Sequence, residues 1–514
     1  MKENNCNNIL VRGVNWIGDA VMTMPALRAI KRSNPDARVT LLVKPWVSPL
    51  FDKDPNVDQV ILYSDLHKGV AGKFRLAQEI RKYDFCLAIL FQNAFDAALI
   101  AFLAGIQSRV GYARDGRSFL LTEAVPCDGQ ARSVHQVGYY LNLLYKSGIP
   151  ATEEIPWMHL GIEERIAARH TLKELKRPII GINPGAAFGS SKRWRPARFA
   201  EVAKRVLFEI KGSVVIFGSP SEAAIAEEIE REVLRFPGGP EMKPQLLNMA
   251  GRTDLRELSS LISECDLLVT NDSGPMHIGY SVRTPVVAIF GSTSPEHTGP
   301  AGRHDVVIKK VLDCAPCLER ECRKKSLDCM DMITSEEVFN AVKERVSSKK
   351  AVFFDRDGTL CKDPGYLRRI EDFEVLPGVD DVFRLKESGF LLIGVTNQSG
   401  IARGLVGEDF VRKVNDIFLE KYGFDGFYFC PHHPDEHCPC RKPAPGLLLD
   451  ARVDYNIDLK NSFVIGDRDL DMVLSKSVGA TGILVRTGQE SFSENADHIV
   501  GDIREAVDLI LQKD

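Results

Sequence analysis

Short runs of β-branched and aliphatic residues alternate with amphipathic stretches along most of this chain. In the first third, strands expected at 8–13 and 38–44 flank a helix expected at 18–33. The rhythm returns with strands expected at 178–185, 212–219, 267–272 and 284–292 and with helices expected at 195–210 and 255–266. Strands that alternate with helices predict doubly wound parallel sheets. Two such series, divided near 161–177, exceed what one sheet normally contains.

A third αβ series begins after a short polar segment. Thr334 and Glu337 have the spacing of a capping box and predict a helix over 334–346. The polar residues 347–350 then precede a new apolar strand. At roughly 150 residues per domain, the length indicates about three domains. We therefore expect an α/β protein with domains at 1–165, 166–346 and 347–514.

The composition is that of a soluble globular protein, with 44% hydrophobic and 26% charged residues. A net charge of -4 gives no electrostatic reason to expect a nucleic-acid partner. The N-terminus lacks a secretory pattern, and the apolar window 86–105 is interrupted by Gln92, Asn93 and Asp96. We therefore expect no membrane span and a reducing, cytoplasmic location.

The 12 cysteines divide into isolated and clustered residues. In a reducing compartment, clusters indicate metal binding before disulfides. The isolated residues are Cys6, Cys86, Cys127, Cys265 and Cys361. One cluster consists of Cys314, Cys317, Cys322 and Cys329. Its last two cysteines have an unusual spacing for zinc, so metal binding and packed thiols are both open readings.

Two aspartates follow the first apolar run of the third series. Asp355 is expected at the carboxyl end of a strand, where parallel sheets place their ligand crevices, and Asp357 lies two residues on. Such a pair alone also fits a solvated turn. Here it is followed, in order, by Thr396 at the end of a second apolar run, Lys442 before an expected helix, and Asp467 after a third run.

This order of motifs resembles the haloacid dehalogenase (HAD) superfamily of phosphotransferases over about 350–489. The resemblance implies that Asp355 attacks phosphorus and forms an aspartyl-phosphate, while Asp357 protonates the leaving oxygen and then activates water. Mg²⁺ would be held by Asp355, the Asp357 carbonyl and Asp467. Thr396 and Lys442 would hold the phosphoryl oxygens during transfer.

A compact set of metal-ligand residues lies in the same region. Three thiolates and one imidazole make a closed set for structural Zn²⁺. The expected ligands are Cys430, His432, Cys438 and Cys440, with His433 and His437 as spare candidates. With the DPGY and TNQSGIARG stretches, this loop resembles the sugar-phosphatase branch that contains D-glycero-D-manno-heptose 1,7-bisphosphate 7-phosphatase. The implied substrate contacts are Asp363, Gly365, Tyr366, Asn397, Gln398, Ser399 and Arg441. Anomer preference is open.

The first two series carry a candidate site of their own. Gly18 and Asp19 occupy the first strand-to-helix turn, in an order that departs from the GxGxxG of dinucleotide sites. Further on, small residues precede Lys192 and Arg193 at an expected helix start, which suits a diphosphate. Glu222 is placed for a ribose hydroxyl. Another helix is opened by Asp272, Ser273, Gly274 and His277.

These motifs resemble the ADP-heptose:lipopolysaccharide heptosyltransferase family over about 8–346, most closely its second inner-core type. The resemblance implies the GT-B fold, two Rossmann-like domains with ADP-heptose mainly on the second. Asp19 would deprotonate the acceptor hydroxyl before inverting attack, and Lys192 would neutralise the ADP leaving group. The implied donor-binding set is Lys192, Glu222, Met249, Asp272, Ser273, Gly274 and His277. No metal is expected here, because 52–54 is typical of a polar turn.

The leading hypothesis is a bifunctional enzyme of lipopolysaccharide-core biosynthesis. One domain would remove the 7-phosphate of heptose bisphosphate, and the other would transfer heptose from ADP-heptose to a lipid-anchored inner-core saccharide at the cytoplasmic membrane face. Arg114, Arg117 and Arg132 are candidate contacts for anionic sugars or lipid phosphates, although a charge run is usually a solvated face. His135 is a candidate helix cap, buried residue or acceptor contact. Alternatives are a phosphatase for histidinol phosphate and a non-catalytic sugar- or membrane-binding N-terminal module.

Overall fold

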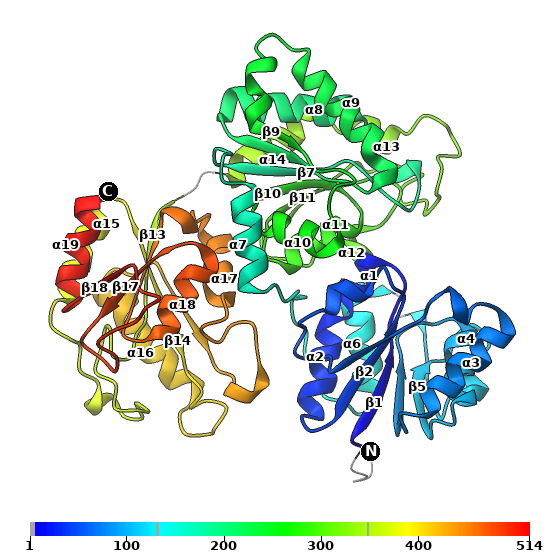
Figure 1. Ribbon diagram of the computed structural model, residues 1–514, viewed down its shortest axis with the longest axis horizontal. Helices are drawn as coiled ribbons and strands as arrows, with labels where there is room; N and C mark the ends of the chain where they lie inside the picture. Colours follow the sequence, from blue (N-terminus) through cyan, green and yellow to red (C-terminus); the bar gives the residue numbers. More distant parts are fainter. Residues whose placement is uncertain (1–5, 130–132, 347–348, 514) are drawn as a thin grey trace. The chain divides into compact units, whose positions relative to one another are not determined.

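Three six-stranded parallel sheets form the framework of this protein (Figure 1). The computed structural model describes residues 6–129, 133–346 and 349–513. These residues group into two compact units, Met1–Glu344 and Arg345–Asp514. Two sheets belong to the first unit and one to the second, so the alternating strand and helix pattern predicted the fold class correctly.

The first sheet has the strand order β3-β2-β1-β4-β5-β6, with all neighbours parallel. Its strands are β1 (Asn8–Arg12), β2 (Arg38–Val43), β3 (Gln59–Leu62), β4 (Leu87–Leu90), β5 (Ser108–Tyr112) and β6 (Glu123–Val125). Its described helices are α1 (Ile17–Met22), α2 (Met24–Ser33), α3 (Gly69–Arg81), α4 (Phe95–Leu103) and α6 (Gln136–Lys146). The apolar window at 86–105 thus forms β4 and α4. Among the described helices, none has the length and hydropathy needed to cross a bilayer.

The second sheet repeats this topology in the order β12-β11-β10-β7-β8-β9. Its strands are β7 (Ile179–Asn183), β8 (Ser213–Ile216), β9 (Leu246–Asn248), β10 (Leu267–Asn271), β11 (Val286–Phe290) and β12 (Val306–Lys309). The helices are α7 (Ile162–Thr171), α8 (Pro196–Arg205), α9 (Ala223–Leu234), α10 (Leu255–Glu264), α11 (Gly274–Ser281), α12 (Pro295–Thr298), α13 (Asp328–Asp331) and α14 (Ser335–Arg345). The predicted capping box is present, because Thr334 N donates to Glu337 and Glu337 N donates to Thr334.

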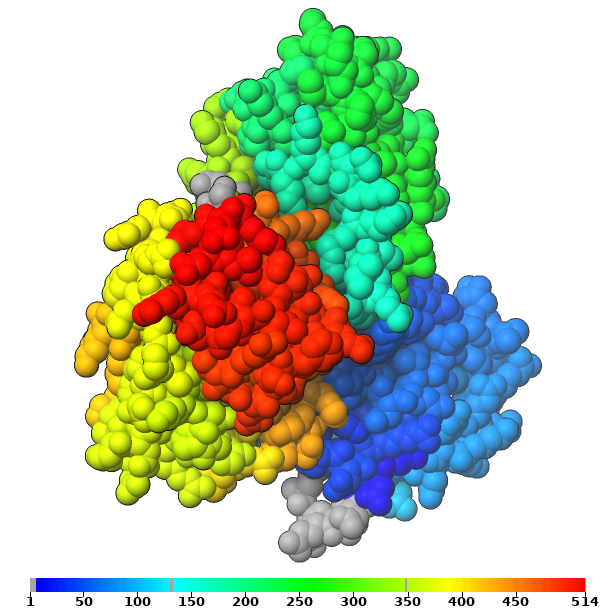
Figure 2. Space-filling model, turned by 60° about the vertical axis from the view of Figure 1, so that its left-hand side comes forward, coloured from blue at the N-terminus to red at the C-terminus, as the bar shows by residue number. Residues whose placement is uncertain are grey.

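The third sheet again has this topology, in the order β15-β14-β13-β16-β17-β18. Its strands are β13 (Ala351–Phe354), β14 (Leu391–Asn397), β15 (Gly426–Cys430), β16 (Phe463–Gly466), β17 (Thr481–Val485) and β18 (His498–Val500). Its helices are α15 (Val382–Glu387), α16 (Glu408–Lys421), α17 (Gly446–Tyr455), α18 (Asp469–Val478) and α19 (Ile503–Lys513). In Figure 2 this unit, yellow to red, is one continuous body.

The helix expected at 18–33 is divided in two. α1 ends at Met22 and α2 begins at Met24, with Thr23 between them. Pro25 lies in the first turn of α2, where its missing N–H leaves no hydrogen bond unmade; inside a continuous helix it would remove one. The break leaves Asp19 in a short helix of its own. The helix expected at 195–210 also changes, from α8 into a π-helical turn at Val206–Ile210.

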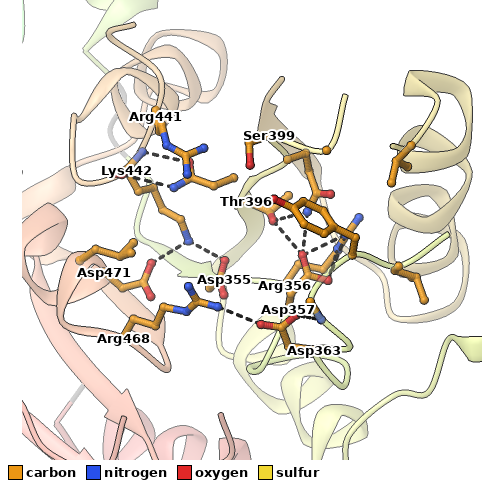
Figure 3. Close-up of a pocket in the computed structure, with 18 residues that line it drawn as sticks. Asp355, Arg356, Asp357, Asp363, Thr396, Ser399, Arg441, Lys442, Arg468 and Asp471 are labelled. Atoms are coloured by element: carbon orange, nitrogen blue, oxygen red, sulfur yellow. Dashed lines mark hydrogen bonds and ion pairs between the residues drawn. The ribbon is translucent and has the colours of Figure 1, made fainter. Parts of the chain in front are cut away.

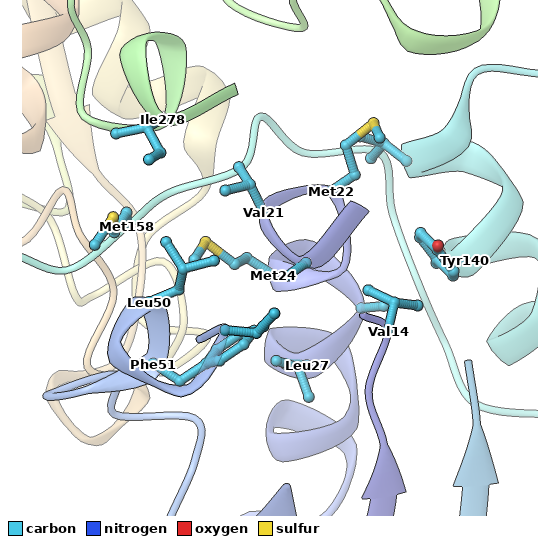
Figure 4. Close-up of a cluster of buried hydrophobic side chains, with 14 of the residues drawn as sticks. Val14, Val21, Met22, Met24, Leu27, Leu50, Phe51, Tyr140, Met158 and Ile278 are labelled. Carbon is cyan, nitrogen blue, oxygen red and sulfur yellow. The ribbon is translucent and has the colours of Figure 1, made fainter. Parts of the chain in front are cut away.

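One buried core joins the two sheets of the first unit. Val21 of α1 and Leu50 lie in the same cluster as Met158 and Ile278 of α11, and each is at most 1% exposed (Figure 4). Gly18 permits this packing, because a Cβ there would lie 2.6 Å from the His277 ring. α1 can therefore lie directly on α11, which brings Asp19 to the ligand edge of the second sheet.

Cys6 and Cys86, which sequence analysis treated as isolated thiols, form a disulfide. Cys6 precedes β1 and Cys86 precedes β4, and these two strands are neighbours in the sheet. The two cysteines are 80 positions apart in the sequence, which gave no indication of this pairing.

Candidate active sites

In the second and third sheets, candidate residues follow two neighbouring strands. These two strands lie at the point in the sheet where the strand order reverses direction. In the third sheet, Asp355 follows β13 and Asp467 follows the neighbouring strand β16. In the second sheet, Lys192 follows β7 and Asp272 follows the neighbouring strand β10. Parallel sheets of this topology form ligand crevices there, outside the carboxyl ends of the strands.

A pocket of about 230 Å³ lies at this edge of the third sheet (Figure 3). Its lining includes Asp355, Asp357, Asp363, Gly365, Tyr366, Thr396, Asn397, Gln398, Ser399, Arg441 and Lys442. Every predicted catalytic and substrate-contact residue of this domain therefore lies in one cavity. The lining also includes Arg356, Arg468 and Asp471, which sequence analysis left without a role.

Lys442 lies between two carboxylates at the base of the pocket. Its Nζ is 2.5 Å from Asp355 Oδ1 and 2.6 Å from Asp471 Oδ1, and all three side chains are buried. Burial acts to lower the pKa of Lys442, but the charges of Asp355 and Asp471 outweigh it and raise the pKa. Burial also raises the pKa of Asp355, partly offset by Lys442. The single positive charge of Lys442 therefore neutralises only part of the negative charge of Asp355 and Asp471.

Asp355, Asp467 and Asp471 form a group of buried carboxylates that suits a divalent cation. Oxygens of the three lie within 4.8 Å of one another. Asp467 Oδ1 and Asp471 Oδ2 are buried and accept no hydrogen bond from the described residues. Gly358 leaves room for Asp467, because a Cβ at this position would lie 2.5 Å from Asp467 Oδ2. Its φ of +91° also favours glycine. Oxygen ligands around unpaired negative charge are the donor set of Mg²⁺.

Asp357 is held apart from this group by neutral and cationic donors. Arg356 Nη2 donates to both Asp357 oxygens at 3.0 Å, and Gln398 Nε2 donates to Oδ2 at 2.7 Å. Arg356 is itself fixed by a hydrogen bond to Asn415. Asn397 has another task, since its side chain bonds both the N–H and the carbonyl of Lys442. The Asp357 carboxylate is thereby oriented and partly exposed.

The expected zinc ligands are also assembled. Sulfur atoms of Cys430 and Cys438, and of Cys438 and Cys440, are 3.4 Å apart, and His432 Nδ1 is 3.2 Å from Cys440 Sγ. All four ligand atoms lie within 4.8 Å of one another, which fits tetrahedral coordination by one ion. His433 is instead the N-cap of a short 3₁₀ helix.

The candidate residues of the first unit form a second site. Lys192 Nζ is 2.5 Å from Asp272 Oδ2, and Thr293 donates to the same oxygen. Burial raises the pKa of Asp19 to about 6; Lys192 opposes this shift and Asp272 reinforces it. Asp19 lies in α1, which follows β1, while Lys192 and Asp272 follow β7 and β10, so both sheets of the unit contribute. A carboxyl with a pKa near neutrality suits proton transfer.

The remaining donor-side candidates follow strands of the same sheet as Lys192 and Asp272. Ser273 is the N-cap residue of α11 and accepts a hydrogen bond from Asn183. His277 is buried in α11, which lowers its pKa to about 4, so it is neutral at pH 7. Glu222 follows β8 and contacts the Gly185 backbone, where a Cβ would lie 1.9 Å from its Oε1. Met249 directly follows β9.

Other residues singled out from the sequence are structural. The prediction that Arg117 contacts anionic sugars or lipid phosphates at the surface is wrong, because this side chain is fully buried and donates to the carbonyls of Gln92 and Tyr112. His135 caps α6 by accepting from Val137 N. Asp54 closes a turn by accepting from Asn56. Arg132 lies outside the described residues.

Two groups of at least three closely spaced metal-ligand atoms occur in the described part of the chain, both in the second unit. The described cysteines at 314, 317, 322 and 329 are not among them.

Comparison with known proteins covers both units. The glycosyltransferase family 9 (heptosyltransferase) profile matches residues 73–328, and a HAD-hydrolase-like profile matches residues 439–506. Lipopolysaccharide heptosyltransferase 2 of Salmonella typhimurium is 32% identical over 313 residues, which cover 59% of this chain and 88% of that protein. D-glycero-beta-D-manno-heptose-1,7-bisphosphate 7-phosphatase of Yersinia pestis is 46% identical over 162 residues, 29% of this chain and 86% of that protein.

A solved structure supports the fold of the first unit. The ADP-heptose lipopolysaccharide heptosyltransferase II of Escherichia coli aligns with a TM-score of 0.57 and 27% identity, covering 66% of this chain and 98% of that one. The expected GT-B fold, with two Rossmann-like halves, is confirmed by this likeness and by the two sheets described above. The chain therefore belongs to the family 9 heptosyltransferases over its first unit and to the HAD-type heptose bisphosphate 7-phosphatases over its second.

Proposed function

We propose that this protein is a bifunctional enzyme that acts on heptose at two stages of lipopolysaccharide-core biosynthesis. The second unit removes the 7-phosphate of heptose 1,7-bisphosphate, and the first unit transfers heptose from ADP-heptose to a lipid-anchored inner-core saccharide. The observation that carries the proposal is the presence, in one chain, of two clusters of carboxylates around a lysine: Asp355 and Asp471 with Lys442, and Asp272 with Lys192 near Asp19. Domain limits at 165 and 346 are part of the proposal.

In the phosphatase, Asp355 attacks phosphorus while Asp357 gives a proton to the leaving sugar oxygen. Asp357 then takes a proton from water, which attacks the aspartyl-phosphate and releases inorganic phosphate. Lys442 and Thr396 contact the phosphoryl oxygens, and Arg441, whose buried Nη1 has no partner among the described residues, is available to the rest of the substrate. Mg²⁺ held by Asp355, Asp467, Asp471 and the Asp357 carbonyl would neutralise charge between nucleophile and phosphate.

The zinc loop positions the phosphate-binding lysine. Cys440 is two residues before Lys442, so Zn²⁺ held by Cys430, His432, Cys438 and Cys440 would fix the start of the segment that carries Arg441 and Lys442. Its role is structural, because all four positions of a tetrahedral ion are taken by protein atoms.

In the transferase, Asp19 accepts the proton of the acceptor hydroxyl as that oxygen attacks the anomeric carbon of heptose. Inversion follows from attack on the face opposite ADP. Lys192 compensates the charge that develops on the departing diphosphate. Glu222, Met249, Asp272, Ser273, Gly274 and His277 form the donor side of the cleft. We infer that this unit works at the cytoplasmic membrane face, where a lipid-anchored acceptor is accessible.

Phosphate release by the full chain tests the phosphatase assignment. With Mg²⁺, we expect kcat/KM for heptose 1,7-bisphosphate to exceed that for histidinol phosphate at least 100-fold, and Asp355→Asn to abolish both. The reverse preference would show that the second unit serves another phosphate ester.

Consumption of ADP-heptose tests the transferase assignment. Asp19→Asn should lower kcat by about 10²–10⁴-fold, the usual contribution of a general base, without weakening ADP binding. Donor binding without any transfer by the unaltered protein would favour a non-catalytic sugar-binding module.

A further inference from the structure

Exposed large apolar side chains follow each of the first five strands of the first sheet. Trp16 follows β1, Trp46 follows β2, Leu66 and Val70 follow β3, Phe95 follows β4, and Phe119 follows β5. Their exposed fractions are 55, 55, 70, 76, 40 and 75%, respectively. Because parallel strands end at the same edge of a sheet, these six residues lie along one edge, here called the apolar rim.

Direct contacts connect parts of the rim. Trp46 Nε1 donates to the carbonyl of Asn15, which precedes Trp16, at 3.0 Å. The rings of Phe95 and Phe119 are 6.1 Å apart. α3, which begins beside Val70, packs against α4, which begins at Phe95. The rim thus includes two local groups, Trp46 beside Trp16 and Phe95 beside Phe119, along one sheet edge, and water-exposed apolar surface of this kind marks an interaction site.

Lysines are interleaved with the apolar residues. Lys44 lies 3.9 Å from the centre of the Tyr63 ring and 5.7 Å from that of Trp46. It forms no ion pair with any acid in the described ranges. Lys68 and Lys73 flank Val70 and pair with one acid each, at 2.9 and 3.5 Å. Tryptophan, phenylalanine and lysine together match the boundary between acyl chains and anionic headgroups, where rings insert and ammonium groups stay in water.

We propose that the apolar rim docks the first unit on an anionic lipid bilayer. Asp19 lies in α1, three residues beyond Trp16, so the same sheet edge carries the rim and the proposed base. The inference rests on the proposed function in one respect: an acceptor anchored in lipid must bring its hydroxyl to Asp19 from the membrane side. Docking by the rim keeps the mouth of the site at the bilayer surface.

Vesicle flotation of the full chain tests the surface. The vesicles contain phosphatidylethanolamine and about 30% phosphatidylglycerol, which gives roughly the surface charge of an anionic leaflet. Zwitterionic vesicles serve as the comparison. The double variant Val70→Ser, Phe119→Ser should lose at least about tenfold in vesicle partition, because each removed side chain contributes apolar area on insertion. Lys44→Gln should reduce the preference for anionic vesicles. A matched control, Tyr145→Ser with Ile166→Ser, removes exposed apolar residues from α6 and α7 and should bind like the unaltered protein.

Turnover separates this inference from the proposed function. The rim variant should transfer heptose normally to a delipidated acceptor but lose activity on the same acceptor anchored in vesicles. Equal vesicle binding by the rim variant and the unaltered protein overturns the docking surface. So does a change of mass in light scattering without a change in vesicle binding, which would make the rim a contact between copies of this chain. Rim-dependent vesicle binding without transfer to either acceptor would instead contradict the proposed transferase.

Discussion

At the scale of single residues, both sites depend on carboxylates that the fold holds in unequal environments. Asp355 is buried beside Lys442, whereas Asp357, two residues away, is bonded by Arg356 and Gln398 and remains partly exposed. Burial raises the pKa of Asp19, although the nearby Lys192 acts to lower it. Under the proposed function, burial and neighbouring side chains would give one residue type three roles: a nucleophile, an acid/base and a base.

The rate of heptosyl transfer should rise with pH through about 6. Asp19 must be ionised to accept a proton, and burial raises its pKa to about 6, with Lys192 lowering and Asp272 raising it from there. The titrating groups nearby, His277 and Tyr140, stay neutral in this range because burial lowers the pKa of the histidine and raises that of the tyrosine. The measurement is kcat/KM from pH 5 to 8 with saturating acceptor; a flat profile through pH 6 contradicts the assignment of Asp19.

The same shift predicts that Asp19→Asn stabilises the protein while it removes transfer. A carboxyl whose pKa is raised on folding destabilises the folded state once it ionises, so the penalty is absent below about pH 4 and complete above about pH 6. At pH 7.5 the variant should gain about 1–2 kcal/mol, after allowance for solvent screening. Thermal unfolding at pH 7.5 and pH 4 measures the difference. An equal change at both pH values would exclude ionisation of Asp19 as the cause.

Sequence reasoning found most site residues because each motif ends a strand. Asp355, Thr396 and Asp467 follow apolar runs, and parallel strands bring such ends together. Asp471 belongs to the same GDxxxD motif as Asp467 and lies in the first turn of α18, but the sequence did not indicate its role. Arg356 and Arg468 were missed because their roles depend on which neighbour each side chain faces. The sequence contained no comparable indication that Arg117 is buried.

At the scale of elements, two short segments carry proposed functional residues: helix α1 carries Asp19, and the Cys/His loop at 430–440 leads directly into Arg441 and Lys442. α1 lies on α11 because Gly18 has no side chain, and it is separate from α2 because of Thr23 and Pro25. The sequence suggested one long helix there, since apolar periodicity continues through the break. The proline was the available signal.

Gly18→Ala should lower heptosyl transfer at least tenfold. The added methyl group would lie 2.6 Å from the His277 ring, so α1 or α11 must shift and Asp19 moves with it. Gly138→Ala is the matched control, because its new Cβ would be 3.8 Å from the nearest side-chain atom and lies in helix α6. Steady-state transfer by both variants decides the question: similar rates would mean that the α1–α11 contact does not position Asp19.

Loss of zinc should reduce phosphatase activity without affecting transfer. Cys438→Ser removes one of four ligands, so the segment that carries Arg441 and Lys442 loses its anchor, and we expect at least a tenfold fall in kcat. Zinc content and phosphate release are measured together. His433→Asn keeps the short helix cap and should retain both. Full activity in zinc-free protein would show that the loop is ordered by other contacts.

At the scale of the whole molecule, one strand order is used three times for two chemistries. In the second and third sheets, the candidate residues follow the first and fourth strands, which are neighbours in this order. Periodicity predicted parallel sheets with alternating helices, but it did not predict that all three share one strand order. It also gave no signal for the Cys6–Cys86 disulfide, which depends on β1 and β4 being neighbours.

The two units should unfold independently. Calorimetry of the full chain is expected to show two transitions, because Met1–Glu344 and Arg345–Asp514 each have their own core. ADP should raise only the transition of the first unit, and Mg²⁺ with phosphate only that of the second, since each ligand stabilises the unit that binds it. A single transition shifted by both ligands would show that the units fold as one.

Assays of Asp19→Asn and Asp355→Asn for both reactions decide whether one chain contains two separate active sites. We expect Asp19→Asn to lose heptosyl transfer and to release phosphate from heptose 1,7-bisphosphate at the unaltered rate. We expect the reverse for Asp355→Asn. The assignment of one chemistry to each unit would be contradicted if either substitution abolished both reactions, or if it abolished neither reaction.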